Sequence, residues 1–324
     1  MTADDVSQYT DEVLGEIRGA VVTDETFLQT VLSGVLAEGH VLLEDVPGTG
    51  KTLVARSFAE TLGLSFSRVQ FTPDLLPTDI TGTEVYDENT STFDFVEGPV
   101  FANVVLADEI NRAPPKTQAA LLEAMEERQV TVAGETYDLP DPFFVIATQN
   151  PVEQEGTFQL PEAQVDRFML KSSMGYPDHD GERQLIDRRL DRRTKDPSVD
   201  AVVTADDVRS MQERPEDVRV EDPIREYVVA IARETREDRR VDVGVSPRGT
   251  QRFVEVCRAW ALLEGRDYVA PEDVKAVAQA ALAHRLVLTT EAEMQETEKG
   301  AIIDAVLDRI EVPAIGGAAS ADRS

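Results

Sequence analysis

The chain has 324 residues, enough to bury a core as one large domain or two smaller ones. It carries 62 acidic residues against 32 Lys and Arg, which gives a formal net charge of −30. Because so acidic a surface repels phosphate backbones, general DNA or RNA binding is disfavoured. The apolar fraction of 41% is normal, so the acidic excess indicates a solvated folded surface and not disorder.

The cysteine content and the chain start bear on the cellular location. Cys257 is the only cysteine, so no intrachain disulfide can form and nothing indicates an oxidising compartment. The opening segment MTADDVSQYTDEV is acidic and polar, unlike a signal peptide. No apolar run approaches the ~20 residues that span a bilayer. We therefore expect a soluble, cytoplasmic protein that does not enter a membrane.

The first half of the sequence alternates between strand and helix patterns. Apolar residues at helical spacing over residues 11–36 predict two helices before the first strand. Five short apolar runs then predict strands, and helical patterns over residues 52–62 and 117–128 separate several of them. This alternation indicates a largely parallel sheet covered on both faces. The predicted strands are residues 40–43, 66–71, 103–107, 143–148 and 168–170.

Two further segments alternate and are turn-rich, which predicts inserted β-hairpins over residues 83–96 and 130–139. After Tyr176 and Pro177 the pattern becomes helical, so the second half is expected to be a helical bundle. Its predicted helices are residues 183–193, 224–235, 247–263, 271–286 and 291–310.

The segment EDVPGTGKT, residues 44–52, follows an apolar strand and begins a helix, which is the context of a phosphate-binding loop. Gly48 and Gly50 would let backbone N–H groups turn towards phosphates, Lys51 would reach the β and γ oxygens, and Thr52 would hold Mg²⁺. Asp45 stands where the simple motif has glycine, so it needs a negative φ or the tolerance of Asp for a positive one. A plain turn before a helix is the weaker alternative. The residues expected to bind ATP are Asp45, Val46, Pro47, Gly48, Thr49, Gly50, Lys51, Thr52 and Leu53.

A second motif, VVLADEIN over residues 104–111, ends an apolar strand in two acids. Asp108 would bind Mg²⁺ through water, and Glu109 would polarise the attacking water. The alternative is that both acids only cap the next helix, but the phosphate-binding loop upstream favours the catalytic interpretation. No other metal site is expected, because His40, His179 and His284 lack metal-ligand spacing.

Several long segments together resemble the MoxR family of AAA+ ATPases, which is part of the helix-2-insert group. They are VPGTGKT, ADEINRAPPKTQAALLEAMEERQVT, ATQNP, GTFQLPEAQVDRF and GVSPRG, in the family's order, and the resemblance spans roughly residues 11–310. It implies a P-loop NTPase of the α/β class with inserted hairpins over residues 1–195 and an all-helical lid domain over residues 200–311. Residues 312–324 are expected to form a flexible tail.

The resemblance also implies roles for three polar residues outside the two nucleotide motifs. Asn150 matches sensor 1, which orients the hydrolytic water with Glu109; alone, ATQNP would be interpreted as an Asn-Pro turn. Arg167 matches the arginine finger that a subunit donates to its neighbour's ATP. Arg248 matches sensor 2, which contacts the γ-phosphate from the lid. A lone arginine in so charged a chain would be assigned to the solvated surface.

The predicted function is ATP hydrolysis by a ring of subunits, with six as the family expectation. The resemblance implies chaperone-like remodelling or maturation of client complexes, including metal-cofactor insertion, alongside a partner with a von Willebrand A domain. In such rings the two hairpins face the pore and contact the substrate, although ordinary surface hairpins are an equal alternative. Two other functions are weighed, a weakly hydrolysing nucleotide-gated scaffold and a helicase-like DNA motor. The acidic surface argues against the motor.

Overall fold

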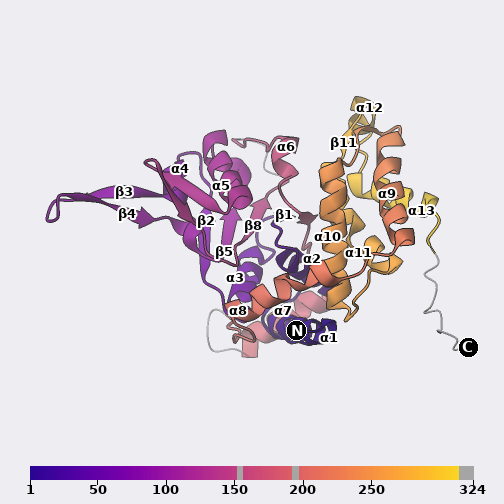
Figure 1. The fold of residues 1–324 in the computed structure, drawn as a ribbon, viewed down its shortest axis with the longest axis horizontal. Helices are drawn as coiled ribbons and strands as arrows, with labels where there is room; N and C mark the ends of the chain where they lie inside the picture. The colour runs from indigo at the N-terminus through magenta and orange to yellow at the C-terminus, as the bar shows by residue number, and fades with distance from the viewer. Residues whose placement is uncertain (152–155, 192–196, 314–324) are drawn as a thin grey trace, which may run out of the picture.

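A computed structural model of the protein describes residues 1–151, 156–191 and 197–313. An α/β body lies beside a group of C-terminal helices, and the β3–β4 hairpin extends from the far side of the body (Figure 1). The predicted α/β half followed by a helical half is therefore confirmed. The predicted tail lies outside the described residues from residue 314 onwards, as does part of the expected boundary between residues 195 and 200.

The centre of the body is a five-stranded sheet in which each neighbouring pair is parallel, in the order β2-β5-β8-β1-β9. All five predicted strands are present, and the last begins two residues later than expected. β5 and β8 place apolar side chains in the cores on both faces of the sheet, as expected for covered strands of a parallel sheet. The strands are β1 (Val41–Glu44), β2 (Phe66–Gln70), β5 (Val104–Asp108), β8 (Phe144–Gln149) and β9 (Leu170–Ser172).

Alternate side chains of the strands enter two separate apolar cores. Val41 and Leu43 enter the core that also contains α1, α2 and α3, whereas Leu42 enters the core beneath α5. This division follows from the two-residue period of a strand, which points successive side chains to opposite faces. The helices of the body are α1 (Ala3–Ala20), α2 (Glu25–Leu36), α3 (Lys51–Thr61), α4 (Pro77–Thr81), α5 (Pro115–Glu127) and α6 (Glu162–Val165).

Both predicted hairpins form, and neither joins the central sheet. They are β3 (Gly82–Asp87) with β4 (Thr92–Glu97), and β6 (Gln129–Val132) with β7 (Glu135–Asp138). A stacked pair of rings, Phe95 and Tyr137, joins the two hairpins with centroids 4.0 Å apart. At the outer part of the first hairpin, Tyr86 and Phe93 pack against each other but stay largely exposed.

The helices after β9 begin with α7 (His179–Asp191) and α8 (Ala205–Gln212) and continue as α9 (Asp222–Glu237), α10 (Pro247–Leu263), α11 (Pro271–Leu282), α12 (Thr290–Met294) and α13 (Lys299–Arg309). The prediction of one helix over residues 291–310 is wrong, because the chain breaks between α12 and α13, where Glu296 has a φ of 53°. The predicted end of α11 at residue 286 is also too late. A short two-stranded sheet, β10 (Val241–Val243) with β11 (Val287–Leu288), was not predicted.

Within the part of the chain that the structure describes, no helix combines the length and apolarity needed to cross a bilayer.

Two histidines are buried at the junction of the body and the C-terminal helices. His40 Nδ1 accepts the Val145 N–H at 3.1 Å, so its Nε2–H is left to donate to the Met125 carbonyl oxygen at 3.0 Å. Burial, helped by the nearby Arg128 guanidinium, lowers the pKa of His40 to about 3. Burial, together with the adjacent Arg285, lowers the pKa of His284 well below its usual range. Both imidazoles are therefore neutral in the folded protein.

The buried histidines make stability depend on pH. Because the unfolded chain protonates them near pH 6.5 and the folded chain does not, the unfolded state binds more protons below that pH. Protonation of His40 in the unfolded chain should lower the free energy of unfolding by about 2 kcal/mol between pH 7 and pH 5, and His284 should act in the same direction. Chemical denaturation across this range measures the slope. His40→Gln should remove the part of the slope that His40 contributes, with His179→Gln as the matched exposed control; an unchanged slope in His40→Gln would contradict the assignment.

Candidate functional site

The phosphate-binding loop occupies the turn between β1 and α3. Gly48 has a φ of 90° and Gly50 a φ of 100°, values that residues with a Cβ rarely adopt. Gly50 is also the N-cap of α3, and no side chain caps that helix end. The first N–H groups of α3 therefore remain available to an anion, which the helix dipole also attracts.

Lys51 lies inside the curve of this loop. Its ammonium group donates to the carbonyl oxygens of Asp45 at 3.1 Å and Val46 at 2.7 Å. The lysine head is thus held against the loop, and Lys51 lines the same cavity as Gly48 and Gly50, where it can meet a phosphate.

Asp45 fixes the loop to the segment that follows β9. Its Oδ1 accepts from the Ser173 hydroxyl at 2.7 Å and the Gly175 N–H at 2.9 Å, and its Oδ2 accepts from the Met174 N–H at 2.8 Å. The residue is buried and does not have a positive φ. The departure from glycine is therefore accommodated by a negative φ, and the carboxylate acquires three donors far away in the sequence.

Asp108 and Glu109 follow β5 at the same edge of the sheet. Asp108 Oδ1 accepts from the Thr148 hydroxyl at 2.7 Å, and its Oδ2 forms an ion pair with Arg68 at 2.6 Å. Thr148 Oγ1 also receives the Glu109 N–H at 2.8 Å. Thr148 on β8 and Arg68 on β2 thus orient the acids from the two strands that flank β5.

Two donors hold one carboxylate oxygen of the Glu109 side chain. Its Oε2 accepts from Gln70 Nε2 at 2.8 Å and from Arg112 Nη1 at 3.0 Å. Glu109 itself has a left-handed backbone, with a φ of 57°. Sequence analysis missed Arg68, Gln70 and Arg112. Polar residues at alternate positions near the end of β2 were the available signal for the first two.

These groups surround one cavity of about 380 Å³. A hydroxyl from Thr52 and a carboxylate from Asp108 both line it, and hard oxygen donors of this kind fit Mg²⁺. Asn150 lines the same cavity at the end of β8, beside Glu109. The full lining is Asp45, Pro47, Gly48, Gly50, Lys51, Thr52, Arg68, Gln70, Asp108, Glu109, Thr148, Gln149 and Asn150.

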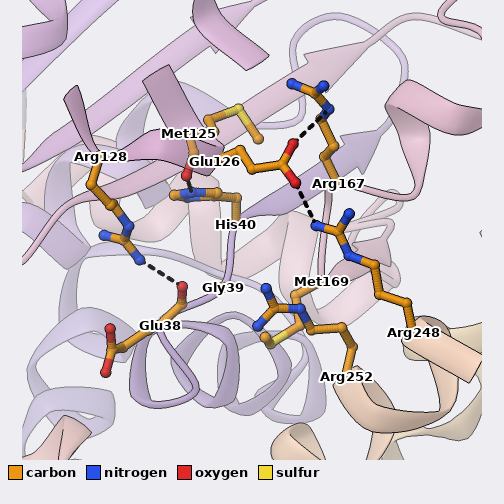
Figure 2. Close-up of a pocket in the computed structure, with 10 residues that line it drawn as sticks. All are labelled: Glu38, Gly39, His40, Met125, Glu126, Arg128, Arg167, Met169, Arg248 and Arg252. Carbon is orange, nitrogen blue, oxygen red and sulfur yellow. Dashed lines mark hydrogen bonds and ion pairs between the residues drawn. The ribbon is translucent and has the colours of Figure 1, made fainter. Parts of the chain in front are cut away.

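Arg167 and Arg248 lie together elsewhere, and neither lines the cavity of this chain's own phosphate-binding loop. Both form ion pairs with Glu126 near the end of α5: Arg167 Nε lies 3.2 Å from Oε2, and Arg248 Nη2 lies 2.9 Å from Oε1 (Figure 2). Arg128 and Arg252 line the same second cavity. Sequence analysis placed Arg248 on the γ-phosphate without anticipating this grouping.

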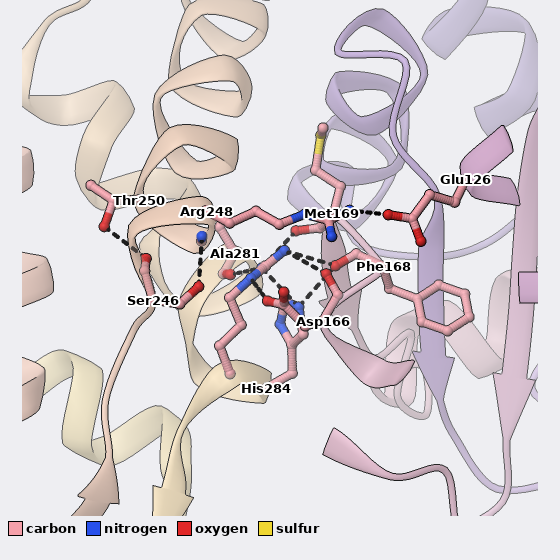
Figure 3. A network of polar contacts seen from close by, with 11 residues as sticks. Glu126, Asp166, Phe168, Met169, Ser246, Arg248, Thr250, Ala281 and His284 are labelled. Atoms are coloured by element: carbon pink, nitrogen blue, oxygen red, sulfur yellow. Dashed lines mark hydrogen bonds and ion pairs between the residues drawn. The ribbon is translucent and has the colours of Figure 1, made fainter. Parts of the chain in front are cut away.

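A buried arginine ties the segment of Arg167 to the C-terminal helices. Arg285 pairs with Asp166 at 2.8 Å and donates to the carbonyl oxygens of Phe168 at 3.0 Å and Met169 at 3.1 Å. Figure 3 labels these three partners. Burial lowers the pKa of the Arg285 guanidinium, and Asp166 opposes that effect. Leaving these carbonyl groups unpaired would be costly, so the segment and the helices are held as one unit.

Comparison with known proteins finds similar ATPases over most of the chain. Residues 40–170 match the ATPase family associated with various cellular activities, and residues 233–306 match the AAA lid domain. The chaperone MoxR1 of Mycobacterium tuberculosis is 42% identical over 314 residues, which cover 94% of this chain and 82% of the relative. Protein MoxR of Methylorubrum extorquens is 34% identical over 324 residues, covering 92% and 93%. A crystal structure from Cytophaga hutchinsonii, assigned as an ATPase, superposes with a TM-score of 0.89 at 40% identity and covers 96% of this chain and 97% of its own.

The contacts of Asp45 can be tested with a nearly isosteric change. Asp45→Asn places an amide N–H group opposite a backbone or hydroxyl donor, so it should cost about 1–3 kcal/mol of folding free energy. Nucleotide affinity should fall on the order of tenfold as the loop relaxes. Chemical denaturation and titration with a fluorescent ATP analogue measure the two effects. Exposed Asp94→Asn on β4 is the matched control, and a wild-type result for Asp45→Asn would show that the three donors do not hold the loop.

Proposed function

Because the chain belongs to the MoxR family of AAA ATPases, we propose that it works as a ring of subunits that couples ATP hydrolysis to the remodelling of partner proteins. The observation that carries the ring is the separation of Arg167 and Arg248 from this chain's own phosphate-binding loop. Because an arginine supplied by a neighbour can stabilise the charge of the transition state, we infer that each subunit presents Arg167 and Arg248 to the ATP of the next.

In the proposed reaction, water attacks the γ-phosphate of ATP and releases ADP and phosphate. The loop N–H groups and Lys51 hold the phosphates. Thr52 and Asp108 would hold Mg²⁺, which neutralises phosphate charge when bound. Glu109 orients the water and accepts its proton, with the side chain kept in place by Gln70. Asn150 holds the water from the end of β8.

The neighbour's arginines complete the proposed site. Arg167 and Arg248 are permanently charged, and their planar groups can donate two hydrogen bonds to one phosphate. Since Glu126 holds both of them in one place, we assign both to the neighbour's ATP. In this proposal Arg248 contacts the γ-phosphate from the lid, as the sensor 2 match implies, but at the ATP of the neighbour and not of its own subunit.

The remodelling activity is supported by the relative named as a chaperone and by the exposed hairpin. Figure 1 shows the β3–β4 hairpin reaching well beyond the body, and Phe93 on it is 65% exposed. An exposed aromatic residue on a projecting hairpin is suited to gripping an unfolded client segment. We propose hexameric assembly, a von Willebrand A domain partner and metal-cofactor insertion into a client complex as the finer features of this function.

Mixing two inactive variants tests the shared site. Glu109→Gln blocks proton transfer at its own ATP, and Arg167→Ala withholds the arginine from a neighbour, so each alone should lose at least about 100-fold in kcat. In a randomly mixed ring about a quarter of the interfaces combine two intact halves, so mixing should restore activity. ATP hydrolysis is measured in high-salt buffer with Mg²⁺, and particle mass is recorded in parallel. Rings that form but gain no activity on mixing would refute the trans arrangement.

The same assay decides which ATP Arg248 serves. If it serves the neighbour, Arg248→Ala should be rescued by Glu109→Gln and not by Arg167→Ala, because Arg248 and Arg167 then lie on the same half-site. If Arg248 serves its own subunit, the pattern reverses. Rescue by Arg167→Ala would therefore restore the assignment based on sequence alone.

A further inference from the structure

Glu126 occupies an unusual position between the two parts of the molecule. It lies on α5 of the body, and its two carboxylate oxygens pair with different arginines. Arg167 comes from the body and Arg248 from the start of α10 in the lid. Figure 2 shows the carboxylate between the two guanidinium groups. One side chain therefore sets the distance between a charge on the body and a charge on the lid.

Stability does not account for this arrangement. The three side chains are between about a third and a half exposed, and ion pairs at such exposure contribute little to folding. The lid is already fastened to the same segment by the buried Arg285, through Asp166 and the carbonyl group of Phe168. Glu126 is thus not required to hold the lid in place.

The pairing leaves donors free for a second anion. The hydrogen bonds in the described residues engage Nε and Nη1 of Arg167, the latter with the Leu122 carbonyl oxygen, and Nη2 of Arg248. A guanidinium has five N–H donors. Both arginines can therefore keep Glu126 and still donate to a phosphate.

Charge explains why a carboxylate is needed there. Arg128 and Arg252 line the same cavity of about 190 Å³, so four guanidinium groups surround a small space. Guanidinium groups gathered around one cavity repel one another, and without a carboxylate the flexible side chains of Arg167 and Arg248 would spread into solvent. A carboxylate that bridges Arg167 and Arg248 offsets that repulsion and restricts their side-chain rotation.

We propose that Glu126 is a positioning residue that holds Arg167 and Arg248 as a single fork for the phosphates of a neighbouring subunit's ATP. This inference rests on the proposed function. Because one half of the fork belongs to the lid, the fork is complete only when lid and body hold their relative position. Through Glu126, the position of the lid in one subunit therefore affects the rate of ATP hydrolysis in the next subunit.

The test is Glu126→Gln, which keeps the shape of the side chain and removes its charge. The value of kcat should fall about tenfold, while KM for ATP, which depends on the subunit's own loop, should stay within about twofold. Glu127→Gln changes the adjacent exposed carboxylate, which has no ion pair in the described residues, and should behave as wild type. Thermal unfolding and particle mass should be equal for both variants.

Mixed rings separate positioning from general damage. Glu126→Gln should be rescued by Glu109→Gln and not by Arg167→Ala, because its defect lies on the arginine half of the interface. The double variant of Glu126→Gln with Arg248→Ala should lose less kcat than the product of the two single losses, because Glu126 acts in part through Arg248. An unchanged kcat, or a loss that Glu109→Gln does not rescue while it does rescue Arg167→Ala, would overturn the inference. Failure of the Arg167→Ala rescue itself would instead refute the proposed function.

Discussion

Parallel pairing of β1, β5 and β8 brings the carboxyl ends of three strands to one edge of the sheet, and the chemistry of the protein depends on that register. The phosphate-binding loop follows β1, the paired acids follow β5, and Asn150 follows β8. Since all neighbours run the same way, groups separated by about a hundred residues in the chain meet within one cavity. A shift of one residue in β5 would turn Asp108 to the opposite face and remove it from Thr148.

The second organising contact is the buried guanidinium of Arg285. It satisfies carbonyl groups of the segment that carries Arg167, and it does so from the short 3-10 turn that follows α11. The arginine that a ring would present to its neighbour is therefore placed by the lid as much as by the body. Asp45 makes a similar link from the body, because it ties the phosphate-binding loop to the segment that leads from β9 towards the lid. Each functional edge of the body is thus linked to the chain that forms, or leads to, the lid.

Local patterns predicted much of this fold because the strands are apolar runs and the helices have strong periodicity. The phosphate-binding loop was recognisable for the same reason, since Gly48, Gly50 and Lys51 are neighbours in the chain. The partners of the acids were not recognisable, because Arg68, Gln70 and Thr148 acquire their roles only when β2, β5 and β8 pair. Glu126 lies among charged residues near the end of α5, where nothing local distinguishes it from Glu127.

The cavity lined by Arg128, Arg167, Arg248 and Arg252 gathers positive charge, although the chain as a whole is strongly acidic. A net charge of −30 makes any two copies repel. The repulsion is strongest at low salt, because the Debye length is about 30 Å at 0.01 M and about 3 Å at 1 M. A ring of such subunits needs a local attraction at each contact that survives this screening. Four guanidinium groups around one cavity supply positive charge where the neighbour's nucleotide would supply negative charge. Salt would weaken the long-range repulsion far more than the short contacts at the phosphate, so assembly of an acidic ring and completion of its site are favoured by the same conditions.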